Sequence, residues 1–333
     1  MDKLNLLNGY YGYSNFGDDL FVEVFKKHLA NQGISKVVFS HEKSAGFSGK
    51  LDQIFNTLKA NTITLGGGSI LGVSGYSSIR NAEIYLKDII KFKYSAVGVG
   101  LYDHKNIPIK MIKKMDFLAV RSVRDFDLLK KHYPNVFYGS DLAYAYSSLF
   151  DYNKNNKNNK NNIGLILTDI GYYANKLIIE SNVKKFIDFI KINFSNDYLI
   201  NIYNLQPARY QDQEIISKVI YYFKKYKVNY SYFNHINVHE TISNISVNKF
   251  VFTDRLHGGI ISHVLGIPFS LSLHHNKCYD FLHDVGYLNN LFNFEKSYSN
   301  DFILDPKLSL KEIVFHESLA LSSLNLWYSK IFA

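Results

Sequence analysis

Phe250-Val251-Phe252-Thr253-Asp254-Arg255-Leu256-His257-Gly258-Gly259 predicts an apolar strand that turns through two glycines into a helix, which the pattern continues to Leu265. A turn of this kind presents backbone N–H groups and the positive end of the helix dipole to one point in space. Arg255 can hold a phosphate or carboxylate through two parallel hydrogen bonds. Gly258 and Gly259 allow the backbone to approach a ligand closely. The segment therefore predicts an anion site.

A purely structural interpretation of the same segment stands beside this one. A glycine pair at a strand-to-helix turn often serves only to pack the helix tightly onto the sheet. Arg255 could also be neutralised by its neighbour Asp254. The remainder of the chain has to decide between the two.

Strand and helix patterns alternate through both halves of the chain. Apolar runs typical of strands lie at residues 4–8, 37–40, 62–65, 96–100, 117–120, 136–138, 163–168, 198–203, 229–233, 250–253 and 269–273. Helical patterns lie at residues 20–29, 79–92, 125–132, 183–194, 213–226, 238–245 and 259–265. This alternation predicts two Rossmann-like α/β domains with parallel sheets. Because ligands bind beyond the carboxyl ends of parallel strands, we expect the site in a cleft that the two domains face.

The domain boundaries follow from an Asn/Lys-rich segment near the middle of the chain. Residues 151–162 cannot bury apolar surface, and we expect a solvated linker there. It separates an N-terminal α/β domain at 1–150 from a C-terminal α/β domain at 163–305 that holds the donor anion site. Residues 306–333 predict a helix with an apolar stripe. We expect this helix to pack back on the N-terminal domain, and interfacial contact with a membrane is the alternative.

Composition excludes several classes of protein. Hydrophobic residues make up 47% of the 333 residues and charged residues 20%, and no apolar run reaches the roughly 18 residues of a membrane-spanning helix. The N-terminus lacks the pattern of a signal peptide and Cys278 is the single cysteine, so we expect a cytoplasmic protein without disulfides. The net charge of +9 is thinly spread, which argues against nucleic acid and favours anionic substrates or the anionic inner face of the cell membrane.

A loop at residues 9–19 follows the first predicted strand and leads into a helix. It has neither the GxGxxG spacing of a dinucleotide site nor the Gly-Lys-Ser/Thr of a P-loop. Asp18 and Asn15 are its candidate functional residues. The structural alternatives are that Asp18 caps the helix and that Asn15 is a turn residue.

Two more segments lie at predicted strand ends. Gly66-Gly67-Gly68-Ser69 follows a buried strand, where successive glycines leave N–H groups exposed as an anion nest. Arg124 and Asp125 begin a helix after another strand, and Asp141 follows the next one. A surface pair between Arg124 and Asp125 is the structural alternative.

Together these landmarks resemble the polysaccharide pyruvyl transferase family. The resemblance covers roughly residues 4–286, and its ordered motifs are Gly12/Asn15/Gly17-Asp18, Gly66-Gly67-Gly68, Val97-Gly98-Val99-Gly100, Arg124-Asp125, Asp141, Arg255-Leu256-His257-Gly258, Gly266-Ile267-Pro268, and Lys277 ahead of Phe281-Leu282. No single motif is specific, but the ordered set is. Asp254 departs from the uncharged residue usual in the family, and the Asn/Lys-rich linker is peculiar to this chain.

The resemblance implies a glycosyltransferase-B-like pair of domains and transfer of a pyruvyl group from phosphoenolpyruvate to two sugar hydroxyls. The product is a cyclic ketal on a cell-surface glycan or its lipid-linked precursor, and phosphate is released. Phosphoenolpyruvate is a co-substrate, and neither a further cofactor nor a metal is implied. Peripheral contact with the membrane is implied where the acceptor is lipid-linked.

Roles can then be assigned to individual residues. Phosphoenolpyruvate carries two anionic groups, which Arg255 with the helix start at Gly258-Gly259, and Arg124 from the other domain, could hold. His257 is suited to protonate the enol carbon or relay the proton. Either Asp18 or Asp141 could accept a hydroxyl proton, and the sequence does not choose between them. The full candidate substrate-binding set is Arg255, Arg124, Gly258, Gly259, Gly67, Gly68, Ser69, Asn15, Asp141 and Lys277.

Three other hypotheses fit less well. A sugar-nucleotide-dependent glycosyltransferase would use a similar phosphate grip, and a non-catalytic glycan-binding protein would not need Arg255 and His257. His235 and His239 have the i, i+4 spacing of a metal pair, but the sequence shows no third ligand nearby.

Overall fold

A computed structural model describes residues 4–41, 55–73, 77–152, 161–169, 176–194, 197–289, 291 and 309–332. The chain divides into two compact units. The first consists of Met1–Gly12, Gly17–Tyr152 and Val314–Ala333, and the second of Tyr13–Phe16 and Asn153–Ile313. Most of the Asn/Lys-rich linker, residues 153–160, lies outside the described residues.

The first unit is built on a six-stranded sheet with the order β2-β1-β3-β4-β5-β6, in which every pairing is parallel. Its strands are β1 (Leu4–Gly9), β2 (Val37–His41), β3 (Ala60–Leu71), β4 (Lys93–Leu101), β5 (Phe117–Val120) and β6 (Phe137–Tyr138). Its helices are α1 (Phe16–Asn31), α3 (Ser77–Ile89), α4 (Ile109–Ile112), α5 (Val123–Lys130), the 3₁₀ turn η2 (Leu142–Ala145) and α6 (Tyr146–Leu149).

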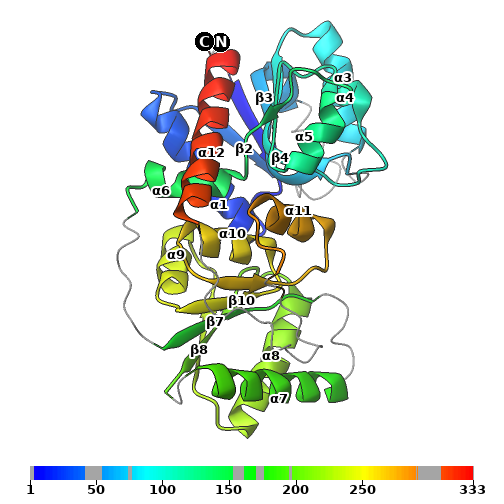
Figure 1. Ribbon diagram of the computed structural model, residues 1–333. Coiled ribbons are helices and arrows are strands. Elements are labelled where there is room, and N and C mark those ends of the chain that lie inside the picture. The colour runs from blue at the N-terminus through cyan, green and yellow to red at the C-terminus, as the bar shows by residue number, and fades with distance from the viewer. Residues whose placement is uncertain are drawn as a thin grey trace. The chain divides into compact units, whose positions relative to one another are not determined.

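The second unit is built on a five-stranded, wholly parallel sheet with the order β11-β10-β7-β8-β9. Its strands are β7 (Asn162–Ile166), β8 (Leu199–Asn204), β9 (Tyr230–Asn234), β10 (Phe250–Thr253) and β11 (Phe269–Leu271). Its helices are α7 (Lys176–Asn193), α8 (Tyr210–Lys225), α9 (Val238–Ser246), α10 (Leu256–Val264) and α11 (Asn276–Asp284). Two parallel-sheet α/β units were predicted from the alternating patterns, and the structure confirms them (Figure 1).

In each sheet, successive strands are added first on one side of the starting strand and then on the other, which creates one topological switch point. This point lies between β1 and β3 in the first unit and between β7 and β10 in the second. In open α/β sheets, ligands bind beyond the carboxyl ends of the strands at such a switch point. The topology therefore directs attention to the loops that follow β1, β3, β7 and β10.

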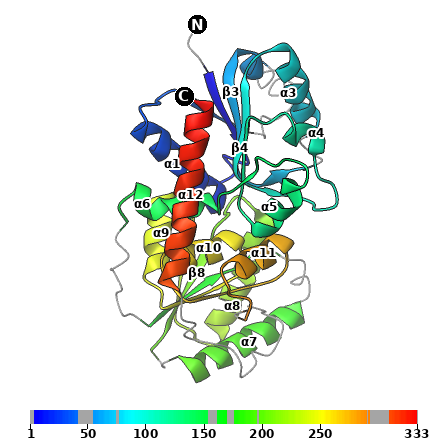
Figure 2. The same ribbon diagram turned by 45° about the horizontal axis from the view of Figure 1, so that its top comes forward.

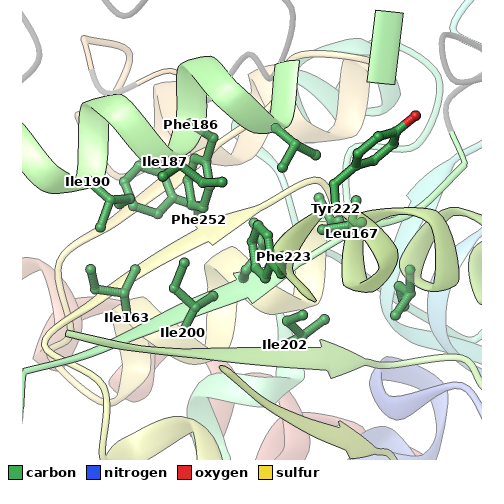
Figure 3. Packing of buried hydrophobic residues seen from close by; sticks show 14 of the residues in the cluster. Ile163, Leu167, Phe186, Ile187, Ile190, Ile200, Ile202, Tyr222, Phe223 and Phe252 are labelled. Atoms are coloured by element: carbon green, nitrogen blue, oxygen red, sulfur yellow. The ribbon is translucent and has the colours of Figure 1, made fainter. Parts of the chain in front are cut away.

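The core of the second unit lies between its sheet and the helices α7 and α8. Ile163, Ile200 and Ile202 on the strands face Phe186, Ile190 and Phe223 on these helices, as Figure 3 shows. All six side chains are fully buried. Residues on both faces of β7 and β8 are buried, so Ile163 to Ile166 form an almost continuous apolar run, whereas β8 also buries Asn201, whose side chain donates to Asn248 Oδ1.

The C-terminal helix α12 (Leu310–Ile331) contributes its later residues to the first unit. Trp327 is fully buried, and its indole N–H donates to Thr64 Oγ1 on β3 and to Ser95 Oγ on β4, both at 3.1 Å. Its ring also packs edge-on against Phe25 of α1, and Figures 1 and 2 show α12 beside α1. Trp327 therefore anchors this part of α12 to the sheet.

No helix in the described part of the chain is both long enough and apolar enough to cross a membrane.

Replacing Trp327 with Ala should lower the free energy of unfolding by about 3–5 kcal/mol, because the change leaves a large cavity and removes the donor shared by Thr64 and Ser95. The matched control is Leu326→Ala on the same helix, where the side chain is 39% exposed and the loss should be small. Urea denaturation of both variants measures the difference. Equal losses would show that α12 is not anchored through Trp327.

Candidate functional site

Arg255 occupies the N-cap of α10, two residues after the end of β10 and beside the switch point of the second sheet. Its Nη2 donates to Gln206 Oε1 at 3.0 Å and forms an ion pair with Asp212 Oδ2. The sequence had suggested Asp254 as the neighbour that could neutralise Arg255. In the structure a paired carboxylate comes from the first turn of α8, 43 residues away in sequence.

Asp212 is fully buried and is held from several sides. Its Oδ1 accepts hydrogen bonds from Thr168 Oγ1 and from the backbone N–H of Asp169, both at 2.9 Å. Arg209 Nη1 lies 3.3 Å from the same oxygen. A carboxylate is tolerated in such a position only when it is paired and hydrogen-bonded, and here both conditions are met.

The two glycines at the start of α10 serve packing. A Cβ on Gly258 would lie 2.3 Å from Thr253 Oγ1, and a Cβ on Gly259 would lie 3.3 Å from the side chains of Leu271 and Phe269. Both backbone N–H groups donate to the carbonyl of Arg255, at 3.0 and 3.2 Å. Both amides therefore already donate within the first turn of the helix, and a substrate contact by Gly258 or Gly259 stays a prediction.

His257 and Lys277 lie on neighbouring helices of the second unit. His257 is half-buried in the first turn of α10, which begins three residues earlier than the sequence pattern indicated, and Lys277 is exposed in the first turn of α11. The structure keeps both at the carboxyl edge of the second sheet. Their proposed contacts with substrate stay predictions.

His274 shares this edge and was not recognised from the sequence. Burial, together with the smaller effects of His275, Lys277 and Arg255 nearby, lowers the pKa of His274 to about 4. Its Nδ1 is 2.9 Å from Ser272 Oγ. Lys277 and Arg255 both act on His274 through their positive charge, and a positive local potential favours an anionic ligand.

In the first unit, Asp18 lies in the first turn of α1, since the helix begins at Phe16. It is therefore not the N-cap that the structural alternative required. Asp18 is buried, and its Oδ1 lies 3.7 Å from the position that a Cβ on Gly68 would take. Asn15 immediately precedes the helix. The loop after β1 thus brings one carboxylate of the candidate set against the glycines of β3.

Gly66, Gly67 and Gly68 lie inside β3, not in a turn after it. Gly66 and Gly68 pair with Val97 and Val99 of β4. A Cβ on Gly66 would lie 2.6 Å from the ring of Phe25, and one on Gly67 would lie 2.2 Å from the ring of Phe21. The predicted turn is therefore wrong for this segment, and a substrate contact by Gly67 or Gly68 stays a prediction. The missing side chains let α1 approach the strand closely.

Arg121 joins two members of the predicted set at the ends of β3 and β6. Its Nη2 donates to Ser69 Oγ at 2.7 Å, and its Nη1 donates to Asp141 Oδ2 at 3.1 Å. Asp141 also caps η2 by accepting from the backbone N–H of Ala143. Burial raises the pKa of Asp141, and the guanidinium of Arg121 opposes this shift.

Arg124, which the sequence favoured, is exposed on α5. Its neighbour Asp125 is buried and contacts His104 Nε2 at 2.8 Å. Asp125 Oδ2 also accepts from the backbone N–H of Leu101. The structure therefore assigns the buried arginine of this segment to Arg121, and a substrate contact by Arg124 stays a prediction.

The two histidines considered as a metal pair do not share a helix. His235 precedes α9 and contacts Thr241 Oγ1 at 2.8 Å, whereas His239 lies within α9. No group of three or more potential metal ligands occurs among the described residues.

Four of the residues that form these clusters were missed by sequence reasoning: Arg121, Arg209, Asp212 and His274. Asp212 gave no signal, because it lies inside an amphipathic helix without a surrounding motif. A usable signal existed for the other three, since each is a basic residue within a few positions of a strand's carboxyl end. Arg121 directly follows β5, but substrate binding was assigned to Arg124 because Arg124 precedes an aspartate.

The fold has clear structural relatives. The structure of UDP-GlcNAc 2-epimerase from Methanocaldococcus jannaschii matches with a TM-score of 0.64 at 13% identity, covering 98% of this chain and 100% of that one. UDP-GlcNAc 2-epimerase from Neisseria meningitidis bound to UDP-GlcNAc matches with a TM-score of 0.57 at 10% identity, covering 99% and 100%. At such identities the likeness shows the fold alone, which is a glycosyltransferase-B-like pair of α/β units.

The family is shown by the sequence of the chain. The family model for polysaccharide pyruvyl transferase matches residues 15–272, which span both units and include Asp18, Arg121, Asp212 and Arg255. The chain belongs to the polysaccharide pyruvyl transferase family. Among curated proteins, none matches it significantly.

The lowered pKa of His274 predicts an acid-sensitive contribution to stability. The folded state disfavours protonated His274, whereas the unfolded chain protonates it near the ordinary pKa of about 6.5. Stability should therefore fall as the pH drops from about 7 towards 4. The His274→Asn variant should lose less melting temperature between pH 7 and pH 5 than the wild-type protein does. An identical loss in both proteins would contradict the assignment.

Proposed function

We propose that the protein transfers the pyruvyl group of phosphoenolpyruvate to two hydroxyls of a sugar in a glycan or its lipid-linked precursor, with release of phosphate. The observation that carries the proposal is the Asp212–Arg255 pair, which holds a guanidinium at the switch point of the second sheet in a chain of this family. An anionic donor is the ligand that such a group recognises best.

The reaction balances without a further co-reactant. Two C–O bonds form between the sugar hydroxyl oxygens and the carbon that carries the phosphate, and the bond from that carbon to the phosphate oxygen breaks. Of the two hydroxyl protons, one ends on the methylene carbon, which becomes a methyl group, and the other ends on the released phosphate. The protein therefore has to neutralise an anionic donor and move two protons.

Arg255 and Lys277 are proposed to neutralise the donor. The contacts with Asp212 and Gln206 fix the plane of the Arg255 guanidinium before any ligand arrives, so less side-chain entropy is lost on binding. His257 follows Arg255 by two residues, in the first turn of the same helix. It is proposed to deliver the proton to the methylene carbon, because an imidazole exchanges protons near neutral pH.

For the acceptor side, Asp18 is proposed as the base, because Asp141 has a structural task. Both oxygens of Asp141 already accept hydrogen bonds, Oδ1 from Ala143 and Oδ2 from Arg121. Its tasks are thus to cap η2 and to hold Arg121. Asp18 faces Gly68, where the strand carries no side chain to block a hydroxyl ligand.

The direct test incubates the protein with phosphoenolpyruvate and a panel of glycan acceptors, and follows phosphate release together with the mass of the glycan. The proposal expects both phosphate and a glycan carrying one pyruvyl ketal. Stabilisation of the protein by a nucleoside diphosphate sugar, with no response to phosphoenolpyruvate, would instead identify a glycosyltransferase.

Asp18→Asn should reduce phosphate release by about 100-fold or more while leaving the melting temperature nearly unchanged, because the amide keeps the shape but cannot accept a proton. The matched control is Asp19→Asn, which removes the same charge from the same helical turn. Its activity should stay within a few-fold of wild type. Normal turnover by the Asp18 variant would remove Asp18 as the base.

A further inference from the structure

The helices that follow the strands of the second unit begin in an unusual way. The N-cap residues of α8, α10 and α11 are Arg209, Arg255 and His275, and none of the three side chains makes a capping hydrogen bond. By contrast, α9 begins with Asn237, whose side chain accepts from the backbone N–H of Glu240. Asparagine is a favoured cap, whereas arginine has no acceptor and adds positive charge at the positive end of the helix dipole. Three helices that depart from the usual N-cap preference at the same edge of one sheet indicate a functional site there.

Arg209 is held in place by three contacts at the end of β7 and the start of α8. Its Nη1 donates to Thr168 Oγ1 at 2.9 Å and lies 3.3 Å from Asp212 Oδ1, and its Nη2 donates to the backbone carbonyl of Asp169 at 3.3 Å. The side chain nevertheless remains 37% exposed. Arg209 is therefore a positioned cation that solvent, and hence a ligand, can reach.

Arg209 and Arg255 share the single carboxylate of Asp212. Arg209 contacts Oδ1 and Arg255 contacts Oδ2, so one carboxylate holds both guanidinium groups. The two guanidinium groups contact opposite oxygens of one carboxylate. This holds them close enough together for one small ligand to contact both. A ligand with anionic groups on neighbouring atoms matches both the spacing and the charge.

We propose that Arg209 and Arg255 form a two-arginine grip for a small ligand that carries two anionic groups, with Asp212 as the residue that positions both. The assignment deepens the proposed function and rests on it for the identity of the ligand, which is phosphoenolpyruvate with its phosphate and carboxylate. The grip lies wholly within the second unit. It needs no contribution from Arg124.

The experiment measures binding by titration calorimetry with three probes: phosphoenolpyruvate, inorganic pyrophosphate as a two-anion probe without a pyruvyl group, and methyl phosphate as a one-anion probe. Arg209→Gln should weaken binding of the two-anion probes by about tenfold or more and of methyl phosphate by less than about threefold, the usual scale for losing one charged contact. Arg209→Lys should restore only part of the loss, because a point charge cannot keep the contacts with both Thr168 and Asp212.

The matched control is Lys218→Gln, which removes the same charge from the same helix at a side chain paired with Glu214. It should leave all three affinities unchanged, so that a general loss of positive charge is separated from loss of the grip. Melting temperatures of the variants confirm that each is folded.

The outcomes separate the grip from the donor. If Arg209→Gln binds all probes as wild type does, or weakens all three equally, the grip is overturned while pyruvyl transfer stands. If the wild-type protein binds pyrophosphate but not phosphoenolpyruvate, the proposed function is overturned, and a selective loss of pyrophosphate in Arg209→Gln still supports the grip. If the wild-type protein binds none of the probes, both are overturned.

Discussion

The second unit depends on one buried carboxylate. Asp212 joins the end of β7, through Thr168 and Asp169, to the start of α10, through Arg255. Removing a charge of this kind from water is costly, and the cost is offset only while all of its partners stay in place. Asp212 therefore constrains α8, α10 and the loop after β7 to one arrangement. This arrangement fixes the positions of Arg209 and Arg255.

In the first unit, glycines, which have no side chain, position the polar groups. Gly66 and Gly67 allow the rings of Phe25 and Phe21 on α1 to lie directly against β3. This close approach carries the first turn of α1, and with it Asp18, to Gly68. Gly100 acts similarly at the end of β4, where a Cβ would lie 3.1 Å from Asp125 and 3.2 Å from Arg121. A scaffold of glycines thus positions the polar groups at the carboxyl edge of the first sheet.

Sequence reasoning succeeded where local pattern determines structure. The strand at Phe250–Thr253 and the helix after it could be predicted because period and turn residues agree over a short stretch. Sequence reasoning failed where the partner of a residue is distant in the sequence. Asp212 is 43 residues from Arg255, and nothing in the intervening sequence specifies that they meet. The glycines of β3 were predicted to form a turn. The sequence does not show that aromatic rings of α1 pack against this strand and leave no room for side chains there.

We propose that Asp212 organises the anion site instead of competing with the ligand for Arg255. The most direct measurement is the affinity of Asp212→Asn for phosphoenolpyruvate, taken with its stability to urea. If the carboxylate positions the arginines, affinity should fall by about tenfold or more and stability by about 3–5 kcal/mol, the usual cost of breaking a buried ion pair. If Asp212→Asn binds phosphoenolpyruvate as tightly as the wild-type protein or more tightly, the carboxylate is a competitor and the account is wrong.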